Sequence, residues 1–210
     1  MNNFFGENGM LYRSVTKMTS LVLLNVLFLL TCIPIVTIGA AISSLYTMTL
    51  QMCRNEESYI LRSYLKAFRQ NFKKATEIWT LFLIGILILG IDFRIVITLE
   101  NLPVRIFVTV LLAVLFILLM VISYAFPLIA AYENTLGHTM KNSFILAMSK
   151  IGYTVPIVAL NFLPMLLIIK DARFLEVGSK VYLLIGFALT AYINSYLFRN
   201  IFEKTLGYKE

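Results

Sequence analysis

Long apolar runs alternate with short polar segments along almost the whole chain. An α-helix needs about 20 predominantly apolar residues to cross the hydrocarbon core of a membrane. By this criterion the pattern predicts an all-α, polytopic membrane protein with about six transmembrane helices. The spans are expected over residues 18–33, 35–52, 76–99, 104–131, 151–169 and 181–198.

The second run leaves an alternative open. Residues 35–52 carry no charge but are rich in Ser, Thr, Gly and Ala, and a helix of this length, about 27 Å, barely crosses a membrane. A re-entrant hairpin here would leave five spans. Pro34 ends the preceding helix because proline lacks an amide donor and disfavours helix in the residue before it. Pro34 and Gly39 are therefore predicted to form a structural turn between the first two runs.

A basic amphipathic segment, residues 58–74, lies between the second and third runs. Its apolar residues recur at helical spacing, so they share one face of a helix. The opposite face carries Arg62, Lys66, Arg69 and Lys73. We predict a cytosolic, interfacial helix that lies flat in the headgroup layer. Docking of a cytosolic partner on the basic face is the alternative.

The composition supports this membrane assignment. Of the 210 residues, 60% are hydrophobic and only 14% are charged, against about 25% charged in a typical soluble domain. No linker interrupts the sequence, so one transmembrane domain over residues 1–210 is expected. Tyrosines near span ends, such as Tyr46, are typical of an aromatic belt. The net charge of +7 comes from basic residues at the ends of apolar runs, which favours the lipid bilayer as partner and no nucleic acid.

The distribution of basic residues predicts the orientation, because cytoplasmic segments of membrane proteins carry an excess of Lys and Arg. With six spans and both termini inside, 13 of the 18 Lys and Arg residues fall on the cytoplasmic side and 5 fall outside. If residues 35–52 did not cross, the division would be 11 to 7. We therefore expect a multi-pass protein of the cell membrane with both termini in the cytoplasm.

The sequence contains no recognisable catalytic motif. The phosphate-binding GxxxxGK[ST] loop and the HExxH zinc motif are absent. The single histidine, His138, cannot form a zinc site alone. Cys32 and Cys53 are expected near opposite ends of one span, where they cannot easily pair. We therefore expect no enzyme activity, no metal and no cofactor.

Five polar residues in the expected spans are candidates for a substrate site. Asn25, Asn161 and Asn194 fall inside spans, where an amide usually hydrogen-bonds a neighbouring helix. Lining a substrate path is the alternative. Asp92 and Arg94 lie near the outer end of the third run, where long side chains reach the headgroups. An outward-facing polar site for a substrate or ion is the alternative for this pair.

Two motifs in the first 80 residues resemble a known family. The expected turn has the pattern P-x-x-T-x-G-A from Pro34 to Ala40, and the amphipathic segment ends in F-x-x-x-F-K-x-A from Phe68 to Ala75. Around these motifs the chain resembles the YesL family of uncharacterised bacterial membrane proteins. Beyond them it is similar to that family mainly in the layout of its spans.

The resemblance implies a location and a role. Members of the family are bacterial inner-membrane proteins, and their genes often accompany carbohydrate ABC transporters and glycoside hydrolases. We therefore expect an accessory component of carbohydrate uptake or utilisation, with a sugar ABC transporter complex as its partner. A small secondary transporter or channel that acts as a homo-oligomer is the alternative. The segment around Glu133 departs from the E-A-A…G loop of ABC permeases, so direct coupling to an ATPase is not favoured.

Overall fold

The computed structural model describes residues 10–56, 59–96, 102–170 and 172–206, and these ranges are almost entirely helical, with no strand. The elements in chain order are α1 Met10–Thr31, a 3₁₀ turn Ile35–Thr37, α2 Ile38–Cys53, α3 Ile60–Val96, α4 Leu102–Ala131, α5 Leu136–Ser149, α6 Ile151–Lys170, α7 Ala172–Val181, a π-turn Tyr182–Gly186 and α8 Phe187–Leu206. The all-α prediction is therefore confirmed for the described residues. Residue 58 and residues 97–99, at the ends of two expected helices, lie outside them.

Several helices are apolar and long enough to cross a membrane, which indicates a membrane protein. Within the described residues there are four of them, Ile35–Cys53, Ile60–Val96, Ile106–Ala131 and Gly178–Lys204. A fifth crossing arises if α5 and α6, bent by 106° at their junction, form one broken span. The first expected span corresponds to a shorter apolar helix, Val15–Thr31. The structure thus supports four or five spans, and the expected count of six is not confirmed.

The amphipathic helix predicted over residues 58–74 is not a separate element of the structure. Residues 60–74 and the described part of the third expected span, residues 76–96, form one continuous helix, α3. At 37 residues, α3 is about 55 Å long. Part of the apolar face of its first half is covered by protein, since Tyr64, Ala67 and Ala75 are buried, whereas Leu61, Leu65 and Phe72 remain exposed. The basic face, Arg62, Lys66, Arg69 and Lys73, remains exposed, as the amphipathic pattern predicts.

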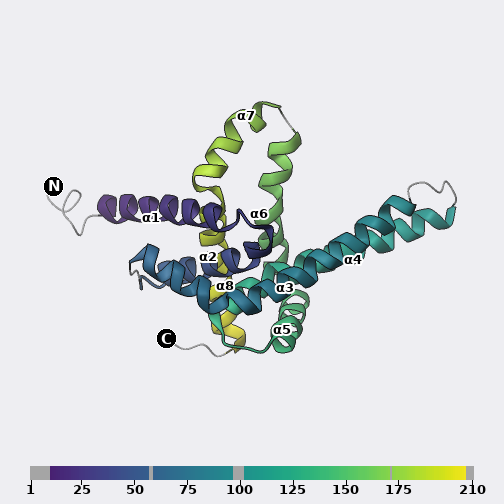
Figure 1. Ribbon diagram of the computed structural model, residues 1–210, viewed down its shortest axis with the longest axis horizontal. Helices are drawn as coiled ribbons and strands as arrows, with labels where there is room; N and C mark the ends of the chain where they lie inside the picture. The colour runs from purple at the N-terminus through teal and green to yellow at the C-terminus, as the bar shows by residue number, and fades with distance from the viewer. Residues whose placement is uncertain (1–9, 57–58, 97–101, 171, 207–210) are drawn as a thin grey trace.

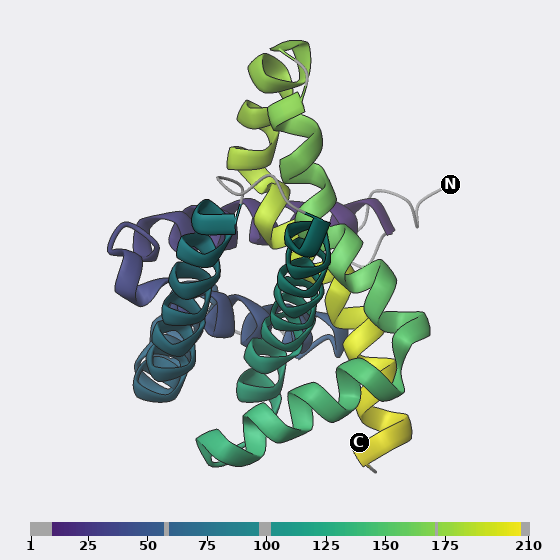
Figure 2. The same cartoon turned by 90° about the vertical axis from the view of Figure 1, so that its right-hand side faces the viewer.

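Two apolar projections extend from the body of the molecule. Figures 1 and 2 show that α3 and α4 form a long hairpin, while α6, α7 and α8 form a second projection in another direction. Large apolar side chains are exposed on both, for example Leu87 on α3, Ile106 on α4 and Leu166 on α6. Apolar exposure on this scale is unfavourable in water, so lipid is the expected surrounding.

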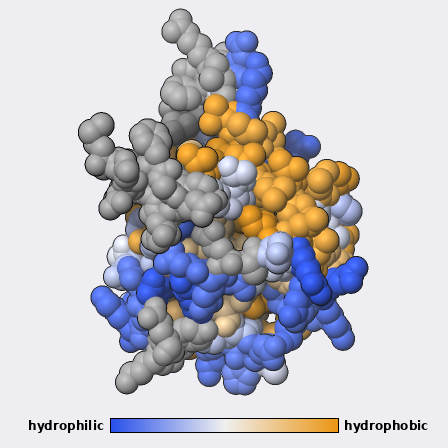
Figure 3. Space-filling model, turned by 90° about the vertical axis from the view of Figure 1, so that its left-hand side faces the viewer, coloured by the Kyte–Doolittle hydropathy of each residue, from blue (hydrophilic) through white to orange (hydrophobic). Residues whose placement is uncertain are grey.

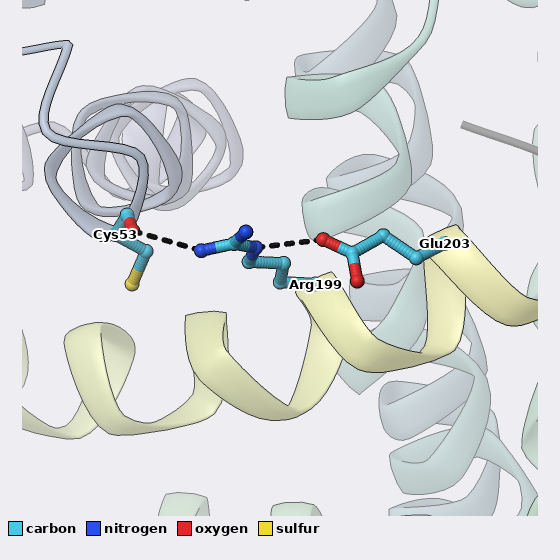
Figure 4. A network of polar contacts seen from close by, with 3 residues as sticks. All are labelled: Cys53, Arg199 and Glu203. Carbon is cyan, nitrogen blue, oxygen red and sulfur yellow. Dashed lines mark hydrogen bonds and ion pairs between the residues drawn. The ribbon is translucent and has the colours of Figure 1, made fainter. Parts of the chain in front are cut away.

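Polar contacts join the ends of three helices at one side of the bundle. Figure 3 shows hydrophilic side chains gathered toward the lower end of one face. Lys17 Nζ of α1 donates to Asn55 Oδ1 beyond α2, at 3.0 Å. Arg199 of α8 donates to the Cys53 carbonyl at 3.3 Å and to Glu203 at 2.7 Å (Figure 4). The first part of α1, the end of α2 and the end of α8 therefore lie on the same side.

The turn between α1 and α2 is held by side-chain hydrogen bonds. Thr37 Oγ1 lies 2.6 Å from the Thr31 carbonyl oxygen and 2.7 Å from that of Pro34, so it closes the turn. Trp79 Nε1 of α3 donates to the Ile35 carbonyl at 2.8 Å. These contacts satisfy carbonyls that the proline break frees, so the predicted turn at Pro34 is also anchored to α3.

Gly39 lies in the first turn of α2 rather than in the connecting turn itself. A Cβ at this position would clash with the Ala75 carbonyl oxygen and would lie 2.6 Å from Trp79 Cβ. The position therefore needs glycine because α2 and α3 approach each other closely here. Close approach also lets the short, polar-rich α2 lie enclosed among α3, α4 and α8.

Candidate functional site

A half-open cavity of about 420 Å³ lies where helices from both halves of the chain meet. Its walls come from α1, α2, α3, α4, α6, the π-turn and α8, and most of the lining side chains are aromatic or aliphatic. The aromatic residues that line it are Phe28, Tyr46, Trp79, Phe82, Phe126, Phe162, Tyr182 and Phe187. This volume falls within the range of about 300–1,000 Å³ typical of small-molecule sites.

One part of the cavity wall is polar and is built from four helices. Asn194 Nδ2 donates to Asn161 Oδ1 at 2.7 Å and to the Tyr46 hydroxyl at 3.4 Å. Asn161 Nδ2 in turn lies 3.4 Å from Ser123 Oγ. Tyr46, Ser123 and Asn161 line the cavity, whereas Asn194 lies behind them. We call these four residues the amide–phenol cluster.

Asn194 is the buried centre of the amide–phenol cluster. Its side chain is fully inaccessible, and within the described part of the chain its Oδ1 has no hydrogen-bond partner. Because its amide nitrogen donates to both Asn161 and Tyr46, it fixes the orientation of the two groups that face the cavity. Asn194 is therefore a positioning residue rather than a direct contact for a ligand.

The cavity lining carries no acidic side chain, basic side chain or histidine among the described residues. A charged ligand would lose its hydration here without gaining an ionic partner, which is strongly unfavourable. The amide, phenol and hydroxyl groups of the cluster instead offer neutral donors and acceptors. The arrangement suits an uncharged ligand with hydrogen-bonding groups on one side and an apolar surface on the other.

The predicted site residues separate into groups. Asn161 and Asn194 meet at the cavity, although they lie in different helices. Asn25 is fully buried and instead binds the backbone of the π-turn and of the start of α8, as described below. Asp92 and Arg94 do not line the cavity. Arg94 is exposed in the last turn of α3, where a positive charge interacts favourably with the helix dipole.

The basic face of α3 forms a separate surface feature. A shallow groove runs along it, lined by Arg62, Leu65, Lys66, Arg69 and Gln70. Its walls are long flexible side chains, so it presents positive charge rather than a shaped pocket. In the described residues no group of three or more His, Cys, Asp or Glu side chains is placed to hold a metal ion.

Sequence reasoning missed the role of Tyr46. It was expected in an aromatic belt at the membrane interface, but the expectation is wrong, since only 5% of the residue is exposed. Its ring packs edge-on against Phe198 of α8 at 5.8 Å between centroids, and its hydroxyl joins the cluster. The available signal was the Ser/Thr-rich character of its run, because hydroxyl side chains in a membrane helix favour contacts with other helices.

Comparison with known proteins identifies one family model. A model described as a protein of unknown function, DUF624, matches residues 21–93, which extend from α1 into the second half of α3. The matched segment contains both sequence motifs and the Pro34 turn, but not Asn161 or Asn194. Neither a curated protein nor a solved structure matches the chain.

Proposed function

We propose that this protein is a YesL-family protein of the bacterial cell membrane, that its cavity binds an uncharged sugar, and that it acts as an accessory component of carbohydrate uptake. The observation that carries the sugar-binding part is the neutral amide–phenol cluster in an aromatic-walled cavity. The family part is supported by the DUF624 match, which covers both motifs of the resemblance.

Sugar chemistry suits the two kinds of wall. Hydroxyl groups of a sugar both donate and accept, as do Tyr46, Ser123 and the amide of Asn161. The C–H faces of a sugar ring carry slight positive charge and pack on the electron-rich faces of aromatic rings. Trp79 and Phe126, with ring centroids 6.4 Å apart, supply such faces on α3 and α4. An uncharged sugar therefore uses both the polar and the aromatic side of the cavity.

The single tryptophan makes the sugar proposal testable without a label. Trp79 lines the cavity, so a bound sugar should change its fluorescence. Titration of the purified protein in detergent with neutral mono- and disaccharides should give a saturable change for at least one of them. The corresponding sugar phosphate should give none, because the cavity has no cationic partner. A folded protein that responds to no neutral sugar would contradict this proposal.

The proposed orientation places both termini in the cytoplasm. It is supported by the contacts that bring the start of α1 and the end of α8 to one side, together with the excess of basic residues there. A reporter that is active only in the cytoplasm should therefore be active when fused at the C-terminus. Activity of a periplasmic reporter at the same position would contradict the orientation.

In the proposed accessory role, the basic face of α3 is the surface on which a sugar ABC transporter complex docks. Co-purification after crosslinking is expected with the unaltered chain and is expected to fall in the double variant Arg62→Glu, Lys66→Glu. The matched control, Lys141→Glu in α5 with Lys150→Glu directly after it, changes the net charge equally and should leave co-purification intact. Equal yields from both variants, with unaltered sugar uptake in a deletion strain, would count against the role.

A second candidate is a small secondary transporter that acts as a homo-oligomer. Interrupted helices near the cavity favour it, because transporters often build substrate sites from such helices. Pro34 breaks the α1–α2 connection, Pro156 and Pro164 lie within α6, and the π-turn precedes α8. Purified protein in liposomes should then move a neutral sugar. Binding without flux would favour the accessory role.

A further inference from the structure

Asn25 bridges the π-turn and the first turn of α8. Its Nδ2 donates to the Leu183 carbonyl at 2.6 Å, and its Oδ1 accepts from the Ala188 amide at 3.0 Å. These two backbone groups are five residues apart, the spacing that a π-turn brings together. The side chain is fully buried. A single amide from α1 therefore bridges the widened turn, 158 residues away along the chain.

The π-turn supplies two aromatic residues to the cavity wall. Tyr182 and Phe187 both line the cavity, and their rings pack at 4.6 Å between centroids. Phe187 also packs on Phe28 of α1 at 5.2 Å. Gly186 leaves room for this arrangement, because a Cβ there would clash with the ring of Tyr182. The position of Tyr182 thus depends on the turn on which Asn25 acts.

We propose that Asn25 is a positioning residue that sets the shape of the proposed ligand cavity by holding the π-turn, and with it Tyr182, against the cavity. This inference rests on the proposed binding function, but it concerns the wall of the site rather than contact with the ligand. Asn25 itself does not line the cavity.

The physical reason lies in the two backbone groups that Asn25 satisfies. An apolar side chain in its place leaves a carbonyl and an amide without their partner in a buried setting, which is unfavourable. Rewinding the turn into regular α-helix restores partners for both, since each then bonds four residues along the helix. A π-turn contains one residue more than a regular α-helical turn. When the turn rewinds, the segment that precedes it therefore rotates by about 100° relative to α8. Tyr182 then leaves the cavity wall, and the cavity widens.

The experiment uses acrylamide, a small neutral quencher, against the fluorescence of Trp79 in the purified full-length protein. In Asn25→Leu the quenching constant should rise above that of the unaltered chain, because withdrawal of Tyr182 opens a path to the indole. Asn71→Leu is the matched control, since Asn71 also bonds another helix but does not line the cavity. The control should leave quenching unchanged.

A double-mutant cycle separates positioning of Tyr182 from a general loosening of the fold. Tyr182→Ala should itself raise quenching, and Asn25→Leu should add nothing further in that background. If Asn25→Leu does not fold, Asn25→Ser takes its place, because its shorter side chain cannot bridge the Leu183 carbonyl and the Ala188 amide together. Unchanged quenching in the folded variants, or full additivity with Tyr182→Ala, would overturn the proposal. Because no sugar is used, this outcome is independent of whether a sugar binds.

Discussion

Replacing Gly39 by leucine is expected to destabilise the protein severely, by about 3 kcal/mol or more, since overpacking a close contact commonly costs 1–3 kcal/mol and here backbone is in the way. The added side chain would meet the Ala75 carbonyl and the Cβ of Trp79, which cannot move without moving α3. α2 would then separate from α3 and lose the cover that its buried hydroxyl groups need. The measurement is the thermal unfolding midpoint of the purified protein in detergent.

Gly90→Leu provides the control for this change. Gly90 lies in the second half of α3, where an added Cβ meets nothing within 4 Å. Leucine there should leave the unfolding midpoint close to that of the unaltered chain, because a helix surface in lipid or detergent accepts an apolar side chain. Equal midpoints for the Gly39 and Gly90 variants would show that α2 and α3 are not closely packed at Gly39.

The sequence pattern was sufficient for the helical class and for the break at Pro34, because both follow from local chemistry. It was not sufficient to predict what covers each apolar face. The amphipathic half of α3 has the periodicity of a helix on a membrane surface, yet α2 packs on part of its apolar side, where Tyr64 and Ala67 are buried, and leaves Leu61, Leu65 and Phe72 exposed. Periodicity shows which side of a helix is apolar but does not distinguish lipid from a neighbouring helix as its cover. The continuity of α3 therefore could not be predicted.

The candidate site shows the same limit. The asparagines were identified because an amide in a span requires a partner, and each of the three has one. Which partner it has depends on tertiary structure, since Asn194 meets Asn161 and Tyr46 from distant parts of the chain. The π-turn had no sequence signal of its own, because Asn25 stabilises it from another helix. Local patterns thus gave the chemistry of these residues but not their arrangement.

Replacing Asn194 by leucine is expected to weaken sugar binding about tenfold or more, since loss of a buried hydrogen-bond partner costs about 1–3 kcal/mol. Asn194 does not line the cavity, so the loss would act through Asn161 and Tyr46, whose side chains would no longer be held in a fixed orientation. The measurement is the midpoint of the Trp79 fluorescence titration with the sugar that binds the unaltered chain.

Asn71→Leu is again the control, because it removes an interhelical amide away from the cavity. The cluster argument also predicts how two variants combine. Asn161→Ala removes the group that Asn194 orients, so Asn194→Leu should weaken binding much less in that background than alone. If Asn194→Leu only destabilised the fold, it would weaken sugar binding by the same factor in the unaltered chain and in Asn161→Ala. It would then also lower the thermal unfolding midpoint in both. Full additivity of the two changes would mean that Asn194 does not act through Asn161, and that the polar wall is not a single recognition unit.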